Sequence, residues 1–226
     1  MSNVPVFINC RDRVSCLRRL VSWLESARGV ERIVLIDNDS TYPPLLDYYA
    51  STPHTVHRLG QNYGHVALWN ANVLGTFAVT GRFVYTDPDV VPGDDCPKDA
   101  IEHLSQLLDR HGDLVKIGLG LRIDDLPDHY KFKQEVLRWE SQFWQHRAGD
   151  GLLGAAVDTS FALYRSQNNT GPAARTDHPY VARHESWYVN SSQIDDEERH
   201  YRSRATCTHW ASDELPPALA AAVRPR

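Results

Sequence analysis

The chain has little cysteine and no long apolar run, and each absence excludes a class of protein. Its four cysteines, Cys10, Cys16, Cys96 and Cys207, show neither a Cys-x-x-Cys spacing nor the density of a disulfide framework. We therefore expect reduced thiols and a cytoplasmic protein. No apolar stretch approaches the roughly 20 residues of a membrane-spanning helix. Residues 1–5 lack the charged and apolar regions of a signal peptide, so we expect none.

Positive charge is not in excess either. The sequence has 24 lysines and arginines against 29 aspartates and glutamates, a net charge of −5. No basic surface for nucleic acid is expected from this balance. With this charge balance, any association with a membrane or a multi-enzyme assembly is expected to be weak and peripheral. With 226 residues, of which 42% are hydrophobic, the chain fits one globular domain spanning residues 1–226.

The first part of the chain alternates between strand and helix patterns. Residues 4–9 and 33–36 are short apolar runs, and residues 15–27 between them carry apolar side chains at the helical period. A strand, a helix and a strand within about forty residues are typical of a βαβ unit and a parallel sheet. The same pattern continues with a helix over 42–49, a strand over 55–59, a helix over 66–77 and a strand over 82–86.

The second part is less regular. A helix is predicted over 97–111, a strand over 114–123, a helix over 128–147, a buried strand pair over 152–163, and a frayed helix over 215–226. Residues 166–204 are polar with embedded aromatics, which indicates a long, partly irregular segment that covers a site.

The stretch Asp87-Pro88-Asp89 follows the strand predicted over 82–86. In extended backbone, residues two apart face the same side, so both carboxylates could bind one cation. Pro88 fixes its own φ and stiffens this spacing. One or two carboxylates, completed by substrate phosphates, are typical of a Mg²⁺ or Mn²⁺ site. Taken alone, however, Asp-x-Asp is more often a solvated turn.

Other polar residues follow the neighbouring strands, at the edge where parallel sheets bind ligands. Arg11 and Arg13 could bind a diphosphate or begin a solvated helix. Asp37 could accept hydrogen bonds from a ribose, or could simply end a strand before a helix cap at Asp39 or Ser40. The remaining candidates lie after the first strand, after the second strand, in a loop that could be a plain turn, and in the helix that follows it: Asn9, Asn38, Asn62, Gly64 and Asn70.

These motifs together resemble the nucleotide-sugar glycosyltransferases of GT-A fold, the family 2 type in particular. The matching residues span roughly the first hundred positions in the family's order: residues 6–13, 36–40, 61–65 with Asn70, and 85–92. The resemblance implies an α/β fold, a Rossmann-like, mostly parallel sheet flanked by helices, with a small acceptor-side C-terminal portion. It implies a nucleotide-sugar-binding half over residues 1–96 and an acceptor-binding half over 97–226. The second half matches less closely, since the family's acidic pair after the central strands is not obvious.

The resemblance also implies roles for residues. The ends of the first two strands hold the base and ribose, the loop around Asn62 and Gly64 closes over the donor, and Asp87 and Asp89 carry Mn²⁺ or Mg²⁺ on the diphosphate. Several GT-A enzymes place a late histidine on the same metal. His209 is the candidate here, although a lone histidine packed beside Trp210 is the plainer interpretation.

Inverting transfer requires a base that deprotonates the acceptor hydroxyl. Asp158 is the first candidate, because it interrupts an otherwise apolar run where a carboxylate is costly unless it is paired or faces a cleft. The plainer interpretation is a turn residue in a hairpin. Glu185 is the second candidate and His184 the third, and Trp187 and Tyr188 beside them could stack on an acceptor sugar or belong to the core.

The sequence therefore predicts a metal-dependent glycosyltransferase that moves a sugar from a nucleotide-diphosphate donor, expected to be a UDP-sugar, to a hydroxyl of a glycan or other acceptor, with inversion. One alternative is a nucleotidyltransferase, which also pairs carboxylates on a parallel sheet. The glycine- and lysine-rich loop expected near the N-terminus of such an enzyme is missing. The other alternative is a non-catalytic nucleotide-sugar-binding module.

Overall fold

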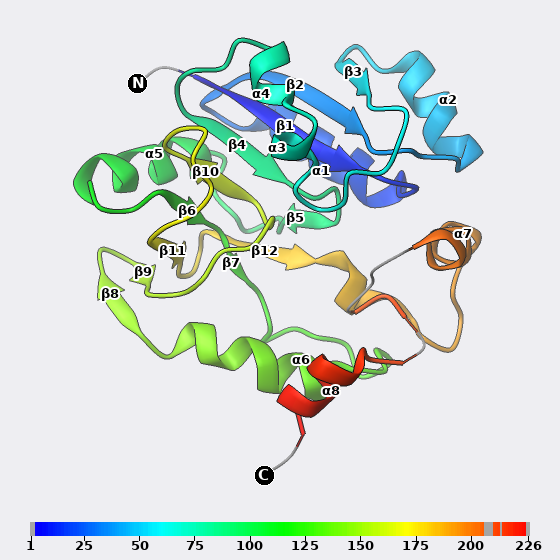
Figure 1. Cartoon of the computed structure of the whole chain (residues 1–226). Helices are drawn as coiled ribbons and strands as arrows, with labels where there is room; N and C mark the ends of the chain where they lie inside the picture. Colours follow the sequence, from blue (N-terminus) through cyan, green and yellow to red (C-terminus); the bar gives the residue numbers. More distant parts are fainter. Residues whose placement is uncertain (1–2, 206–209, 213, 225–226) are drawn as a thin grey trace.

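The computed structural model describes residues 3–205, 210–212 and 214–224. Its first half is the alternation of strands and helices that the sequence predicts: β1 (Val4–Cys10), α1 (Ser15–Ser26), β2 (Val30–Asp37), α2 (Pro43–Ser51), β3 (Thr55–Arg58) and β4 (Phe83–Thr86). The four strands are parallel in the order β3-β2-β1-β4 (Figure 1). All seven residues of β1 are buried, as a central parallel strand requires.

The same sheet continues with strands from the second half. After β4 come β10 (Ala162–Tyr164), β6 (Lys116–Gly118), β11 (Ala173–Thr176), β9 (Leu152–Leu153) and β8 (Arg147–Gly149). β10 is antiparallel to both β4 and β6, whereas β6 and β11 are parallel. The predicted α/β sheet flanked by helices is confirmed. Strands from both sides of residue 96 share it.

A second, three-stranded sheet has the order β5 (Val90–Pro92), β12 (Val181–His184) and β7 (Gly120–Leu121). The single strand predicted over 114–123 is therefore wrong, because it divides at Leu119 into β6 in the large sheet and β7 in the small one. The range 152–163 holds the two buried strands that the sequence predicts, but they do not pair with each other. β9 pairs with β8 and β11, and β10 pairs with β4 and β6.

Helix boundaries differ from the prediction where local backbone interrupts the pattern. The helix predicted over 66–77 is two short turns, α3 (Ala67–Asn70) and α4 (Val73–Thr76), separated by Asn72 in the left-handed region with φ 50°. The helix predicted over 128–147 is reduced to α6 (Lys133–Glu140) and the 3-10 turn η1 (Ser141–Trp144), and Arg147 already belongs to β8. α5 (Ala100–Arg110) matches its predicted position within 97–111.

The long segment 166–204 is more ordered than predicted. It holds β11, β12, the 3-10 turn η2 (Glu185–Tyr188) and α7 (Asp196–Arg204), while α8 (Pro217–Ala222) lies within the predicted C-terminal helix. α7 lies near the carboxyl ends of β1 and β2, on the side opposite β8 (Figure 1).

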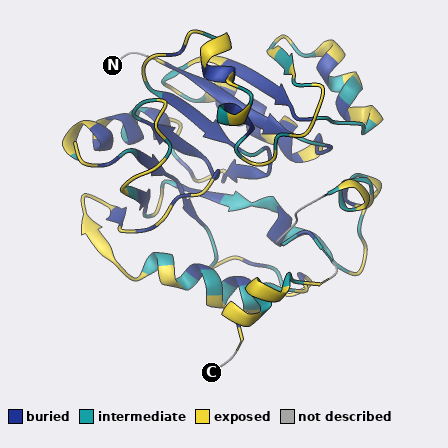
Figure 2. Ribbon diagram, in the orientation of Figure 1, coloured by how far each residue is buried: buried dark blue, intermediate teal, exposed yellow. Residues whose placement is uncertain are grey.

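Two apolar cores lie on the two faces of the large sheet, because alternate residues of each strand point in opposite directions. Val6 and Ile8 of β1 pack on the side of α1 and α5, whereas Phe7 between them packs on the side of α3 and α4. The strands β1, β4 and β10 are buried throughout, and β8 at the sheet edge is exposed (Figure 2). Among the described residues, no helix is long and apolar enough to cross a membrane.

Candidate functional site

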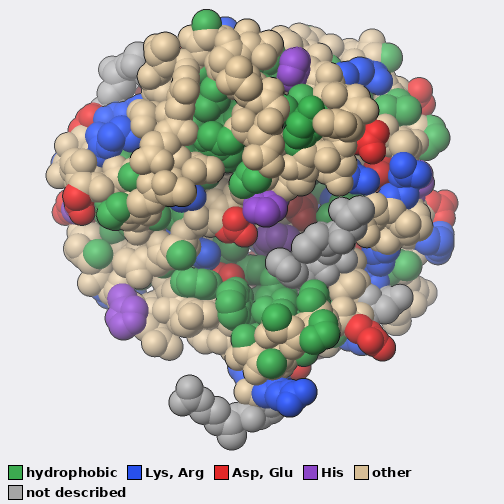
Figure 3. Space-filling view, viewed as in Figure 1, with side chains coloured by type: hydrophobic (Ala, Val, Ile, Leu, Met, Phe, Trp, Pro, Cys, Tyr) green, Lys and Arg blue, Asp and Glu red, His purple; other side chains and the backbone are tan. Residues whose placement is uncertain are grey.

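Asp87 and Asp89 lie in the short connection between β4 and β5, where the chain leaves the large sheet for the small one. Acidic and histidine side chains gather around a hollow near the middle of the face drawn in Figure 3. Asp87 is half-buried, whereas Pro88 and Asp89 are buried. The two carboxylates have different protein partners, so each has its own electrostatic environment.

Asp87 is held by two neutral donors. Thr159 Oγ1 donates to Oδ2 at 2.6 Å, and Asn9 Nδ2 donates to Oδ1 at 3.4 Å. Burial and the adjacent negative charge of Asp89 raise the pKa of Asp87 to about 8, although both hydrogen bonds lower it. No cationic side chain pairs with Asp87 among the described residues. Without a cation, this carboxyl is therefore mostly protonated at neutral pH.

Asp89 is surrounded by donors that favour its charge. Ser186 Oγ donates to Oδ2 at 2.7 Å, Arg13 Nη1 lies 3.6 Å from the same oxygen, and His184 Nδ1 lies 4.0 Å from it. Burial alone would raise the pKa of Asp89. The His184 ring, the Arg13 charge and the Ser186 hydrogen bond together hold this pKa below its ordinary value. All three contacts fall on Oδ2, which leaves Oδ1 outside these pairings.

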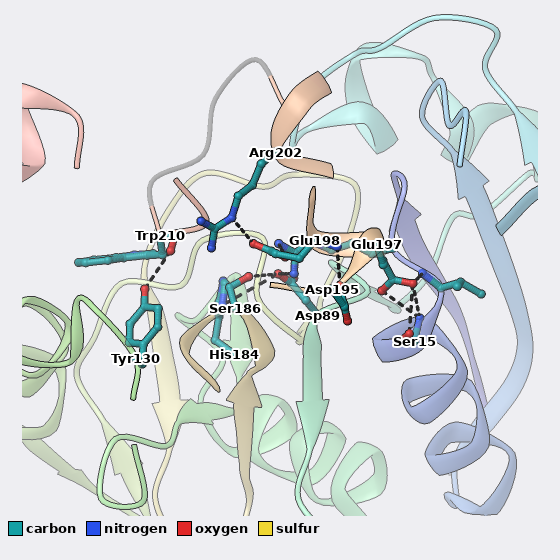
Figure 4. Close-up of polar contacts among 12 residues, drawn as sticks. Ser15, Asp89, Tyr130, His184, Ser186, Asp195, Glu197, Glu198, Arg202 and Trp210 are labelled. Carbon is teal, nitrogen blue, oxygen red and sulfur yellow. Dashed lines mark hydrogen bonds and ion pairs between the residues drawn. The ribbon is translucent and has the colours of Figure 1, made fainter. Parts of the chain in front are cut away.

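Helix α7 completes this network from far along the chain (Figure 4). Glu198 accepts a 2.9 Å bond from Arg13 Nη2 and a 2.7 Å bond from Arg202 Nε. The Arg13 guanidinium also lies 3.9 Å from the centre of the Tyr201 ring. Arg13 is thus a buried residue that joins Asp89 to α7, and not the start of a solvated helix. Its contact with a diphosphate stays a prediction.

The same helix caps α1. The Glu197 carboxylate accepts from the backbone N–H groups of Val14 and Ser15 at 3.0 and 3.1 Å and from the Ser15 hydroxyl at 3.1 Å. These are the unpaired donors at a helix N-terminus, where a negative charge is favourable. The β1–α1 loop is therefore fixed by a segment about 180 residues later in the sequence.

We expect the substitution Glu198→Gln to lower the free energy of unfolding by about 1–3 kcal/mol, because it removes one of two anions that neutralise the buried Arg13. The cost stays below that of a fully unpaired buried charge because Asp89 remains. Urea unfolding measures the change. Glu135→Gln is the control, since Glu135 pairs with Arg138 on an exposed helix face and should change stability by only about 0.5 kcal/mol. Equal effects of the two substitutions would contradict the network.

A set of amide groups holds the loop that follows β3. Asn38 Nδ2 donates to the Gly64 carbonyl at 2.9 Å, and Asn38 Oδ1 accepts from the Tyr63 N–H at 2.7 Å. Asn9 Nδ2 reaches the same Gly64 carbonyl at 3.3 Å, in addition to Asp87. Gly64 has φ +75°, where a side chain would be strained. The structure thus brings the first, second and third strand ends together around one loop.

The remaining predicted donor residues lie around this loop. Asn62 Oδ1 accepts from the Gly64 N–H at 2.9 Å, so the plain-turn interpretation holds for this pair, and Asn70 Nδ2 donates to the Tyr63 carbonyl at 3.3 Å. Asp37 ends β2 and accepts from the Ser40 N–H at 3.0 Å. The helix cap proposed at Asp39 or Ser40 is wrong, because α2 begins at Pro43 with Tyr42 as its cap residue.

The three candidate bases differ in the protein contacts that their side chains form. Asp158 is exposed and forms no hydrogen bond or ion pair within the described chain, yet its charge contributes to raising the pKa of Asp87. Glu185 forms an ion pair with Arg19 of α1. His184 is half-buried, with its ring stacked on fully buried Trp187, and burial lowers its pKa. The hairpin-turn interpretation of Asp158 is wrong, since β9 and β10 are not paired with each other.

Three functional neighbours were not found from the sequence. Thr159 and Ser186 hold the two carboxylates, but a lone hydroxyl carries no signal in one sequence. Asp12 is fully buried at φ 49°, and its Oδ1 accepts from the N–H groups of Thr41 and Tyr42 at 2.6 and 2.8 Å. Asp12 thereby fixes the β1 and β2 ends relative to each other.

The residues fit a hard divalent cation. Asp87 and Asp89 offer carboxylate oxygens, the buried Asn9 Oδ1 has no hydrogen-bond partner among the described residues, and burial and the charge of Asp89 raise the pKa of Asp87. Among the described residues, no group of three or more His, Cys, Asp or Glu could hold a metal by itself. The ion would therefore need further oxygen ligands. The predicted ligand His209 lies outside the described residues.

Comparison with known proteins bears on the fold. No protein-family model matches the chain, and no curated protein is similar to it in sequence. A mannosyltransferase from Pyrobaculum calidifontis, solved with GDP-Man and Mn²⁺, is 13% identical with a TM-score of 0.50 over 98% of this chain and 68% of its own. Glucosyl-3-phosphoglycerate synthase from Mycobacterium tuberculosis, solved with phosphoglyceric acid, is 13% identical with a TM-score of 0.43 over 73% of this chain and 57% of its own.

A third similar structure belongs to another enzyme class. It is a CMP:2-keto-3-deoxy-manno-octonic acid synthetase solved with CTP, 10% identical, with a TM-score of 0.46 over 73% of this chain and 74% of its own. At such identities a structural likeness concerns the fold alone. The likeness to the mannosyltransferase confirms the resemblance at the level of the fold: the chain has the GT-A fold, an α/β fold.

Proposed function

We propose that the protein is a metal-dependent glycosyltransferase that transfers a sugar from a nucleotide-diphosphate donor, expected to be a UDP-sugar, to a hydroxyl of a glycan or other acceptor, with inversion. The observation that carries this proposal is Asp87, a carboxyl with a pKa near 8 beside the ionised Asp89, where β4 of a GT-A sheet ends. Such a pair is disfavoured without a cation and is suited to hold one on an anionic substrate.

Each part of the site has a proposed task. Asp87 and Asp89 hold Mn²⁺ or Mg²⁺, which when bound stabilises the charge of the departing nucleoside diphosphate. Asn9 and Asn38 fix the Gly64 loop that borders the donor. Asp158 accepts the proton of the acceptor hydroxyl. The division into a donor half over 1–96 and an acceptor half over 97–226 stays part of the proposal.

We expect the substitution Asp37→Ala to weaken nucleotide binding by about 1–3 kcal/mol, as the loss of a hydrogen bond to a charged group costs. Asp37 ends β2 beside the loop, with one oxygen on the Ser40 N–H. Isothermal titration with UDP and Mn²⁺ measures the change. Asp39→Ala, which removes a nearby carboxylate that follows the strand, is the control. An unchanged affinity for Asp37→Ala would make Asp37 a purely structural strand-end residue.

A thermal-shift screen tests the proposed function directly, because a ligand that binds only the folded state raises the melting temperature. UDP, GDP, dTDP and CMP are added with and without Mn²⁺. We expect one nucleoside diphosphate to raise Tm in a metal-dependent manner, and its sugar conjugate to release that diphosphate during turnover. Release of pyrophosphate from a nucleoside triphosphate would instead identify a nucleotidyltransferase. Binding without turnover of any donor would identify a non-catalytic module.

A further inference from the structure

A pocket of about 540 Å³ lies on the second half of the large sheet, apart from the nucleotide-side residues described above. It is bounded by the start of β6 at Lys116, the chain segment that leads from β9 towards β10, the loop before β11, and Ala173 of β11. None of the described residues that line it is acidic, and Lys116 is the one with a charge.

Lys116 is an unusual residue to line a pocket. It is only 9% exposed, and within the described chain it forms no hydrogen bond or ion pair. Its ammonium lies 5.0 Å from the centre of the Tyr164 ring. Burial lowers the pKa of Lys116, partly offset by the negative charge of Asp158. Most of the Lys116 side chain is buried, so its position is largely fixed, and its ammonium is available to an anion that enters the pocket.

The opposite wall is suited to the same kind of ligand. Asn169 brings an amide to the pocket, and Thr170 and Gly171 complete this part of its lining. Thr170 is held by Asn168, whose Oδ1 accepts from both its N–H and its hydroxyl. A pocket with one ammonium and neutral polar groups favours a phosphate or carboxylate over a neutral or cationic group.

The pocket is linked to the candidate site by two residues of chain. Val157 lines the pocket, and Thr159 donates to Asp87. Two residues of extended backbone span at most about 7 Å, so a small molecule can bridge these places. Asp158 lies between them, and its charge acts on both Asp87 and Lys116. A group bound at Lys116 would therefore place a neighbouring hydroxyl near Asp158.

We propose that this pocket binds the anionic end of the acceptor, so that the acceptor is a small hydroxylated molecule bearing a phosphate or carboxylate, with Lys116 as its counter-ion. This inference rests on the proposed function, because only a transferase has an acceptor. The pocket itself, and its preference for an anion, depend only on the residues that line it.

The test measures binding of inorganic phosphate, glycerol 3-phosphate, glycerate and glycerol to the intact chain by isothermal titration, without nucleotide. We expect the anions to bind and glycerol not to bind. Lys116→Gln should weaken the anions at least about tenfold and leave binding of UDP with Mn²⁺ unchanged. The matched control is Lys98→Gln, since exposed Lys98 also has its ammonium over an aromatic ring, Trp23, at 4.8 Å but away from the pocket.

A second variant keeps the proposal testable if Lys116→Gln fails to fold. Asn169→Asp keeps the size of a loop residue but adds a negative charge to the pocket, and it should also weaken the anions. Absence of anion binding, or equal weakening by Lys98→Gln, would overturn the pocket proposal even if nucleotide binds. Anion binding that depends on Lys116 in a protein that binds no nucleotide would keep the anion site and remove the proposed function.

Discussion

Asp87→Asn should abolish Mn²⁺-dependent sugar transfer, by a factor of 10³ or more, and at the same time make the metal-free protein more stable at pH 8. The first effect follows because an amide is a much weaker ligand for a hard cation than a carboxylate. The second follows from the raised pKa of Asp87, about 8 against 3.8 for a free aspartate. Asparagine keeps an oxygen for Asn9 and can donate to the Thr159 hydroxyl, so the local hydrogen bonds survive.

The sign of the pH dependence is fixed by proton counting. Between pH 4 and pH 8 the folded wild type retains a proton on Asp87 that the unfolded chain has lost, so this residue lowers stability progressively as the pH rises. The stability gained by Asp87→Asn should be near zero at pH 4, grow with pH, and reach on the order of 5 kcal/mol at pH 8. Urea unfolding at several pH values, with EDTA present, measures it.

Two outcomes would contradict this assignment. Transfer that keeps its Mn²⁺ dependence in Asp87→Asn would place the metal elsewhere. If the difference in stability between wild type and Asp87→Asn does not change with pH, the pKa of Asp87 is not raised in the folded protein. Asp89→Asn is a less clean test, because Asp89 also neutralises the buried Arg13 and accepts from Ser186. Its loss would mix metal binding with the stability of the β1–α1 loop.

Asp158→Asn should lower kcat by on the order of 10²–10⁴, with donor and Mn²⁺ affinity nearly unchanged, because a general base acts in the chemical step. Asp158 is exposed and without hydrogen bonds or ion pairs in the described chain, as a base that must meet an acceptor requires. Steady-state kinetics with saturating donor separates kcat from KM.

Glu185→Gln is the matched comparison. Its carboxylate already pairs with Arg19 and is held at the start of η2, so its loss should change kcat much less. If Glu185→Gln loses transfer while Asp158→Asn keeps it, the base lies in η2. If both variants remain active, base-assisted inversion at either carboxylate is wrong, and His184 or a retaining mechanism takes its place.

The sequence was informative wherever local pattern decides structure. The βαβ unit and the polar ends of the first four strands were predictable because burial of β1 and the helical period of α1 are visible within a few residues. The pairing of strands was not, since the apolar run 152–163 looks the same whether its strands pair with each other or with β4, β6 and β11. Asn72 at φ 50° interrupts a helical pattern that contains no proline, and asparagine, which tolerates the left-handed conformation, also occurs within helices, so it does not by itself predict the break.

In the candidate site, too, some features were predictable from local sequence and others were not. The residues that each strand delivers, such as Asp37 and Asp87, were predictable by position. The partners that determine their charge were not. Arg13 pairs with Glu198, which is 185 residues away, and a single sequence contains nothing that relates the two. The distinction matters for function, because partners and not residue types separate the raised pKa of Asp87 from the lowered pKa of Asp89.

The long-range cap on α1 also has a consequence for the order of folding during synthesis. The Val14 and Ser15 N–H groups receive their Glu197 acceptor only after about 180 further residues have been made. At typical translation speeds of roughly 5–20 residues per second, this takes on the order of 10–40 s. During that interval the N-terminal strands can pair, but the loop beside Asp89 is hydrated and Arg13 lacks Glu198. The parallel strands β1 to β4 can therefore be in place while the loop at the carboxyl end of β1 is unfinished, and its closure by α7 is a late event.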